Sequence, residues 1–387
     1  MRGVSDATDP IEVGSEPELV ERIRSEIERH GPMTFARFME MALYEPELGY
    51  YRAAKARPGR EGDFLTAPET HPIFGRAIAR QLAEMWSLLG RPEPFVVREY
   101  GAGSGALALA ALEGLALDKS PLVDSIRWDA VELDAGRAAQ FTDRLSSAGF
   151  GAAMAPIEPR HTGVVLANEF LDALPVHKVT RTDGALRELY VTWRDGRFHE
   201  ADGPPSTPAL SARLDREGVV LAEGQRAEVC LAIDAWVAGV AAALQRGYVL
   251  VVDYGHPAAE LYGPARRGGT LRAYVRHAAH ADPYRNVGRQ DLTAHVDLTA
   301  VEDAALATGL EVLGVTTQAE FLAGADGDDL LDEARRSAST YEEYLTLRSG
   351  MARLLDPRAM GAFRVVVLGR DVSTLPRIRG LAFRLTR

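Results

Sequence analysis

The stretch that decides the fold is VVREYGAGSGALALAAL, which runs from Val96 to Leu112. A short apolar run ends next to an acidic residue, three alternate glycines follow, and an Ala/Leu-rich segment comes after them. This order predicts a strand, a tight turn and a helix. In open α/β sheets, ligands bind beside the carboxyl ends of the strands, and glycines there let the backbone approach a ligand closely. The stretch therefore predicts a ligand site on the turn.

Strands and helices alternate after this stretch. Before it, residues 1–92 show mainly helical patterns, including TFARFMEMALY with Thr34 as its expected N-cap. The alternation predicts a mainly parallel sheet covered by helices on both faces. The expected strands are 94–100, 127–133, 163–168, 247–253, 310–316 and 363–369, and the expected helices are 104–115, 135–147, 225–244 and 297–308.

A different pattern interrupts the alternation between Pro175 and Ser206. Alternating segments flank two Asp-Gly pairs, which are strong signals for β-hairpin turns. We expect a β-meander inserted into the sheet domain, because the segment is too short to build a core of its own. The predicted domains are a helical N-terminal extension, residues 1–92, and a sheet domain, residues 93–387, with an insertion at about 175–225.

Composition narrows the function classes. The chain has 387 residues and a formal net charge of -11 at pH 7, which argues against general nucleic-acid binding. Its single cysteine, Cys230, excludes an intrachain disulfide and a cysteine-rich zinc site. No apolar run reaches the roughly 18 residues of a membrane span, and no secretory signal follows Met1. We expect a cytoplasmic protein without membrane insertion or a bound metal, and the oligomeric state stays open.

The glycine turn admits two kinds of cofactor. GAGSGA fits the G-x-G-x-x-G/A pattern of dinucleotide-binding proteins, so a nicotinamide dehydrogenase is one alternative. Glu99 favours S-adenosylmethionine, because a carboxylate repels a pyrophosphate and stabilises an ammonium and a sulfonium. Glu132 ends the next strand and can accept the ribose hydroxyls of either cofactor. The expected cofactor contacts in these segments are Glu99, Gly101, Ala102, Gly103, Gly105, Glu132 and Leu133.

Polar side chains also follow two other predicted strands. Asn168 and Glu169 end the strand in VVLANEFLDALPVHKV, and Asp253 and His256 end the strand in VVDYGH. An amide and a carboxylate beside a donor methyl can orient a nitrogen nucleophile and balance its charge. A helix cap for Asn168 and a structural role for His256 are the competing interpretations. Further cofactor contacts are expected from Asn168 and, in the loop GDFLTAPE, from Thr66 and Pro68.

These segments together resemble the MidA family of methyltransferases. The matching words run in order from about residue 31 to 370 and include GPMTFARFMEMALYEPELGYY, GDFLTAPETHPIFG, EYGAGSGALA, NEFLDALPVHKV, VVDYGH and DLTAHVDLTAV. The resemblance implies a class I methyltransferase of the α/β class. Its Rossmann-like seven-stranded sheet would carry a helical N-terminal extension and an inserted region. One departure is that the family's glycine turn usually reads G-P-G-x-G, often with Arg at the fourth position, whereas Ala102 and Ser104 stand here.

The resemblance also implies S-adenosylmethionine as the cofactor and arginine of a protein or peptide as the acceptor. A guanidinium stays protonated at neutral pH, so its methylation needs carboxylates that fix it and accept a proton. A non-catalytic assembly factor that retains the fold is the alternative. The candidate catalytic residues are Glu169, Asp172, Asp253 and His256.

Overall fold

The computed structural model describes residues 12–52, 71–276, 278–325, 327–337 and 340–384. The chain forms two compact units, each assembled from stretches that are distant in sequence. This grouping differs from the sequence-based division at residue 92, which stays a prediction. Unit 1 comprises Met1–Leu65, Ala173–Ala232 and Ala259–Ala294, and unit 2 comprises Thr66–Asp172, Ile233–Ala258 and His295–Arg387.

Unit 2 contains a six-stranded sheet with the order β15-β16-β9-β4-β2-β3. The four strands from β9 to β3 are parallel, and β16 and β15 each run antiparallel to their neighbour. Continuous apolar runs such as VLVV and VVVL form its centre, as expected for strands buried on both faces. The strands are β2 (Phe95–Tyr100), β3 (Ile126–Val131), β4 (His161–Asn168), β9 (Leu244–Asp253), β15 (Glu311–Thr317) and β16 (Arg364–Arg370).

All six strands predicted for this sheet are confirmed. The family resemblance implies seven strands, and this number is not confirmed, because six strands join the sheet within the described residues. The parallel strands β2, β4 and β9 end on the same edge, so the segments that follow them meet there. This edge carries the glycine turn and the polar segments after Ala167 and Val252.

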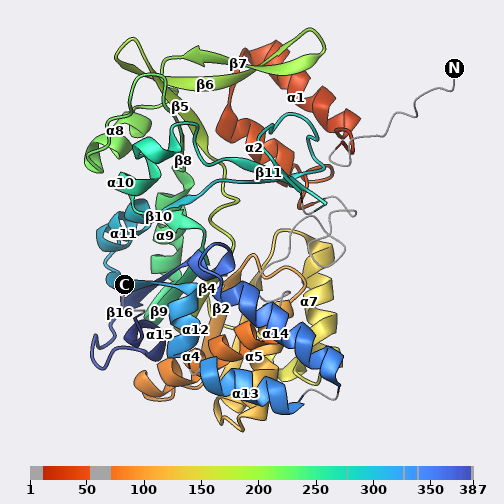
Figure 1. The fold of residues 1–387 in the computed structure, drawn as a ribbon, viewed down its shortest axis with the longest axis vertical. Coiled ribbons are helices and arrows are strands. Elements are labelled where there is room, and N and C mark those ends of the chain that lie inside the picture. Colours follow the sequence, from red (N-terminus) through yellow and green to blue (C-terminus); the bar gives the residue numbers. More distant parts are fainter. Residues whose placement is uncertain (1–11, 53–70, 277, 326, 338–339, 385–387) are drawn as a thin grey trace, which may run out of the picture. The chain divides into compact units, whose positions relative to one another are not determined.

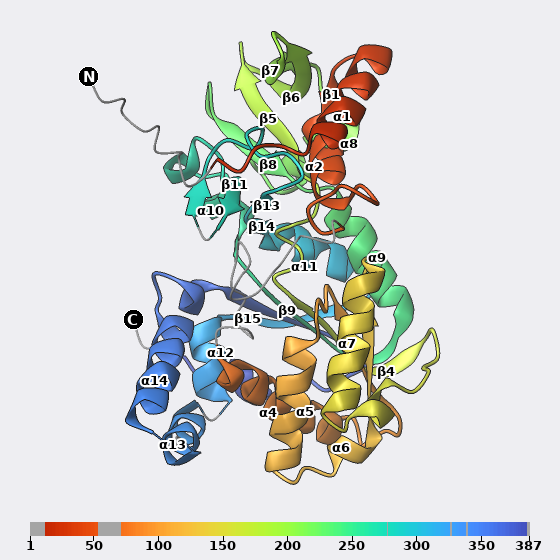
Figure 2. The same cartoon turned by 90° about the vertical axis from the view of Figure 1, so that its right-hand side faces the viewer.

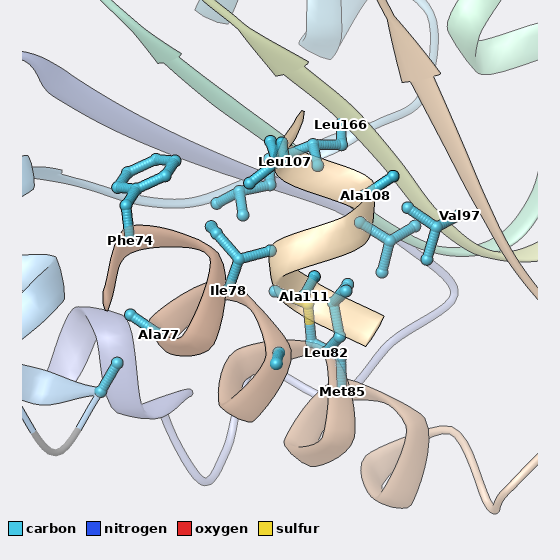
Figure 3. Packing of buried hydrophobic residues seen from close by; sticks show 14 of the residues in the cluster. Phe74, Ala77, Ile78, Leu82, Met85, Val97, Leu107, Ala108, Ala111 and Leu166 are labelled. Carbon is cyan, nitrogen blue, oxygen red and sulfur yellow. The ribbon is translucent and has the colours of Figure 1, made fainter. Parts of the chain in front are cut away.

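Helices pack on this sheet, and α4, α5 and α7 lie together beside it (Figure 2). Phe74, Ile78 and Leu82 of α4 are fully buried with Leu107 of α5 and Val97 of β2 (Figure 3). The elements are α4 (Pro72–Leu88), α5 (Ala106–Leu117), α6 (Leu122–Ser125), α7 (Ala135–Ser147), α9 (Ala232–Ala243), α11 (Leu298–Ala307), α12 (Gln318–Gly324), α13 (Gly327–Ser337), α14 (Tyr341–Leu355) and α15 (Arg379–Ala382), with short strands β10 (Gly255–His256) and β14 (Val296–Asp297).

Unit 1 is built on a five-stranded antiparallel sheet with the order β1-β6-β5-β8, in which β7 also pairs with β6. Its strands β5, β6 and β7 lie beside helices α1 and α2 (Figure 1). The elements are α1 (Pro17–His30), β1 (Met33–Thr34), α2 (Phe35–Tyr44), β5 (His177–Thr182), β6 (Ala185–Arg194), β7 (Arg197–Gly203), α8 (Pro208–Arg216), β8 (Arg226–Val229), α10 (Ala258–Leu261), β11 (Arg272–Val275), β12 (Ala278–His280) and β13 (Asp291–Thr293).

The predicted β-meander is present as β5, β6 and β7. Both of its turns use the predicted Asp-Gly pairs, and all four residues have positive φ, from 50° at Asp195 to 74° at Gly184 and Gly196. The helix predicted over 225–244 begins later, at Ala232, because β8 pairs with β5 instead. Cys230, which follows β8, is buried as expected. In the described part of the chain, no helix is long and apolar enough to cross a membrane.

The meander shares its packing with the N-terminal helices. Strand β1 pairs with β6, so that Met33 faces Val191. The rings of Phe35 and Phe38 from α2 lie 6.1 and 5.1 Å from that of Tyr284, and Phe38 lies 5.4 Å from Phe198 of β7. The segments predicted as an N-terminal extension and as an insertion therefore contribute to one core.

Candidate active site

The glycine turn joins β2 to α5, as predicted. Gly101, Gly103 and Gly105 all have left-handed φ values, of 67°, 54° and 80°, which side chains rarely adopt. A Cβ on Gly101 would lie 3.0 Å from Phe170 Cδ2, and one on Gly105 would lie 2.7 Å from Phe141 Cδ2. At Gly103 the nearest atom would be the Gly101 carbonyl, 4.0 Å away. The described residues therefore leave open space beside Gly103, and the turn fits a ligand that approaches the backbone closely.

Glu132 reaches this turn from the residue after β3. Its Oε2 accepts a hydrogen bond from Gly103 N at 3.0 Å, and its Oε1 accepts one from Asp134 N at 3.1 Å. Glu132 is thus hydrogen-bonded to the glycine turn, and its expected contact with the ribose of a cofactor stays a prediction. Leu133 is 64% exposed, whereas Ala102 is buried, so Ala102 offers a ligand its backbone rather than its side chain.

Glu99 was expected to be an ionised carboxylate, and the structure gives it a different environment. The side chain is buried, and its Oε2 accepts a hydrogen bond from Trp128 Nε1 at 2.8 Å. Burial, with a smaller contribution from the nearby Glu132, raises the pKa of Glu99 to about 8, although the Trp128 hydrogen bond lowers it. At neutral pH this acid is therefore largely protonated in the structure, because its charge would be buried.

Asn168 and Glu169 form a constrained turn at the end of β4. Glu169 has a φ of 50°, which is uncommon for a residue with a side chain, and its N–H donates to the carbonyl of Val252 at 2.8 Å. Asn168 Nδ2 donates to Glu169 Oε1 at 3.2 Å. Asn168 Oδ1 is buried and has no hydrogen-bond partner among the described residues. Strained backbone and unsatisfied polar atoms cluster at functional sites.

Asp253 holds this turn from the adjacent strand β9. Its Oδ2 accepts from the backbone N–H groups of Phe170, Leu171 and Asp172 at 3.2, 2.8 and 3.3 Å. Its Oδ1 accepts from Tyr254 N at 2.8 Å. Burial raises the pKa of Asp253 to about 7, although these four hydrogen bonds lower it. Both oxygens of Asp253 thus face the backbone and hold this turn in place, and the catalytic role expected for Asp253 stays a prediction.

Asp172 is also buried, with 8% of its surface exposed. His256 belongs to a group of rings after β9: its ring centroid lies 5.4 Å from that of His295, which stacks on Tyr254 at 5.5 Å. Tyr254 in turn lies 3.9 Å from Phe363. Tyr254 and His295 were not among the predicted site residues, although the words VVDYGH and DLTAHVD contain them. Thr66 and Pro68 lie outside the described residues.

Comparison with known proteins gives the class of this site. Residues 77–316 match the model of a family of S-adenosyl-L-methionine-dependent methyltransferases. The chain belongs to this family. The expected cofactor and enzyme class are confirmed, and the nicotinamide dehydrogenase alternative is wrong.

Individual relatives agree with the family assignment. The chain is 30% identical to the Drosophila melanogaster "Protein arginine methyltransferase NDUFAF7 homolog, mitochondrial", covering 89% of this chain and 82% of that protein. It is 26% identical to the Homo sapiens protein of that name, covering 92% and 84%. A crystal structure of a Burkholderia thailandensis protein bound to S-adenosyl-homocysteine superposes with a TM-score of 0.86, at 34% identity over 94% of both chains.

The comparisons overturn one expectation. The sequence analysis predicted a cytoplasmic protein. The relatives from Drosophila melanogaster, Danio rerio and Homo sapiens are all named as mitochondrial, so the cytoplasmic prediction is wrong.

Proposed function

We propose that this methyltransferase methylates an arginine side chain of a protein or peptide. The observation that carries the proposal is the turn at Asn168 and Glu169, which places an amide and a carboxylate at the sheet edge that also bears the glycine turn. The names of the relatives, which are protein arginine methyltransferases, support the same acceptor.

The cofactor would be held by the residues around the glycine turn. When bound, S-adenosylmethionine supplies an electrophilic methyl group on a sulfonium. The backbone from Gly101 to Gly105 lets the ligand approach, and Glu132 can accept hydrogen bonds from the ribose. The buried Oδ1 of Asn168 accepts no hydrogen bond from the described residues, and an ammonium or hydroxyl of the ligand would provide a donor. Glu99 would ionise more readily when the cationic cofactor is bound, because a nearby positive charge lowers the pKa of a carboxyl group.

Glu169 would act on the acceptor. A guanidinium presents N–H donors in a planar fork that matches a carboxylate, so Glu169 can fix its orientation and localise positive charge away from the attacking nitrogen. Glu169 would hold the guanidinium so that the lone pair of the attacking nitrogen faces the methyl group that the cofactor would supply. The proton lost from that nitrogen can pass to Glu169 or to the imidazole of His256. Asp172, buried after Glu169, would support the turn.

The test is to change Glu169 to glutamine, which keeps its shape and removes its charge. Turnover on an arginine-containing peptide should fall at least about tenfold, or about 1.4 kcal/mol of barrier. The affinity for S-adenosylmethionine, measured by calorimetry, should stay nearly unchanged. Glu113→Gln, an exposed acid on α5, is the matched control and should leave both unchanged.

Three outcomes separate the alternatives. Full activity in a stable Glu169→Gln protein would remove Glu169 from the mechanism. Loss of thermal stability with little specific loss of rate would make it a structural acid. Cofactor binding by the native protein, without methyl transfer to any protein of the host proteome detectable by mass spectrometry, would favour the non-catalytic assembly factor.

A further inference from the structure

Phe170 touches two different parts of the site. Its ring lies against the glycine turn, where Cδ2 would be 3.0 Å from a Cβ on Gly101. The same ring packs with Tyr100, the last residue of β2, at 5.6 Å and with Trp236 of α9 at 5.9 Å. Tyr100 and Trp236 also contact each other, at 5.6 Å, so the ring is confined on two sides.

The backbone of Phe170 belongs to the other turn. Its N–H donates to Asp253 Oδ2, and the residue before it is Glu169, whose left-handed φ sets the direction of the Cα–Cβ bond from which the Glu169 side chain extends. The rings of Tyr100 and Trp236 limit the rotamers open to Phe170, and the neighbouring Glu169 has few alternative backbone conformations because its φ is left-handed. Ring and backbone thus connect the glycine turn to the turn at residues 168–172.

We infer that Phe170 is a positioning residue that couples ligand occupancy of the glycine turn to ordering of the turn at residues 168–172. The inference rests on the proposed function, because it gives that turn the task of presenting Glu169 to the acceptor. The Phe170, Tyr100 and Trp236 rings are half-buried and in mutual contact, and side chains in contact pass displacements to one another. A cofactor that fixes Gly101 would therefore fix the Phe170 ring, and with it the backbone beside Glu169. Bound cofactor would then raise the affinity for the acceptor, and the acceptor would raise the affinity for the cofactor by the same factor.

Hydrogen exchange tests this coupling without any acceptor. S-adenosyl-homocysteine should slow exchange of the Phe170, Leu171 and Asp172 amides by at least about fivefold in the native protein, because these amides report the opening of the turn. In Phe170→Leu the slowing should fall below about twofold, while the protein still binds the ligand. Phe170→Tyr, which keeps the ring, should retain the native protection.

A double-mutant cycle gives a second measurement. Gly101→Ala introduces a contact with the Phe170 ring as well as an unfavourable φ. The φ cost is the same whether residue 170 is Phe or Leu, so it cancels in the cycle. We expect the Gly101→Ala/Phe170→Leu double variant to bind the ligand at least about threefold more tightly than Gly101→Ala alone.

The pair Gly105 and Phe141 is the matched control, since a Cβ on Gly105 would lie 2.7 Å from Phe141 Cδ2 on α7. Gly105→Ala and Phe141→Leu should couple in ligand affinity yet leave the ligand-induced protection of residues 168–172 intact. Any of three results would overturn the inference. They are native-like protection in Phe170→Leu, no ligand-induced protection in the native protein, and additive effects of Gly101→Ala and Phe170→Leu on ligand affinity. Failure of the native protein to methylate arginine would instead overturn the proposed function and leave the exchange result standing.

Discussion

Replacing Glu99 with glutamine should make the stability of this protein less sensitive to pH. Glu99 is only 3% exposed, and Trp128 Nε1 donates to it at 2.8 Å. Burial, reinforced by Glu132, raises its pKa to about 8 from the ordinary 4.5. Above that pH the folded chain holds a buried negative charge. Glutamine keeps the shape and an oxygen for Trp128, and it removes the charge.

The sign of the effect follows from the direction of the pKa change. Because the folded-state pKa lies above the unfolded value, the folded chain holds a proton on Glu99 that the unfolded chain has released. The stabilisation is fully present below pH 4.5 and is lost as the pH rises towards about 8. Each pH unit inside that window costs about 1.4 kcal/mol. The native protein should therefore lose several kcal/mol that the variant keeps.

Urea denaturation followed by circular dichroism measures this difference. We expect the free energy of unfolding of Glu99→Gln, relative to the native protein, to rise by at least about 2 kcal/mol between about pH 5 and pH 9. The exposed control Glu113→Gln should give no such rise. Parallel pH dependences for the native protein and Glu99→Gln would refute the reasoning, because they would mean that Glu99 ionises normally in the folded state.

Three further substitutions test the site. Gly103→Val should abolish S-adenosylmethionine binding in calorimetry while the protein stays folded by circular dichroism, because the side chain would fill space that the described residues leave open and would strain the left-handed turn locally. Asp253→Asn should lower the free energy of unfolding by about 2 kcal/mol in urea, since one amide oxygen cannot replace a carboxylate that serves four backbone N–H groups. His256→Phe keeps the ring packing on His295 and should reduce turnover on an arginine peptide severalfold with an unchanged melting temperature.

Much of the fold could be predicted because its signals are local. The apolar runs in β9 and β16 are long enough to be recognised without knowing their partners. The hairpin turns were predictable because Asp-Gly pairs tolerate the positive φ that such turns require. The glycine turn was predictable for the same reason, since alternate glycines permit left-handed conformations that other residues avoid.

The parts that could not be predicted depend on contacts between distant segments. Strand β1 is the two-residue segment Met33–Thr34, and it is a strand only because Val191 and Tyr190 of β6 face it. Strand β8 is likewise defined by β5, and its residues RAEV resemble the start of the helix that was expected there. No local pattern in either segment reveals its partner, so the shared core of unit 1 was missed.

The acids at the strand ends show why sequence position alone could not assign roles in the site. Glu99, Glu132, Glu169 and Asp253 all lie at or just after the carboxyl end of a strand, and from sequence each was a candidate for ligand contact or catalysis. Burial and partners separate them. Both carboxylate oxygens of Asp253 accept hydrogen bonds from backbone N–H groups, and Glu99 is buried beside Trp128. Glu132 reaches the glycine turn, and Glu169 lies on a strained turn beside the buried oxygen of Asn168. Glu99 and Asp253 thus have structural roles, whereas Glu132 and Glu169 lie where they can contact a ligand. Only the fold distinguishes the two pairs.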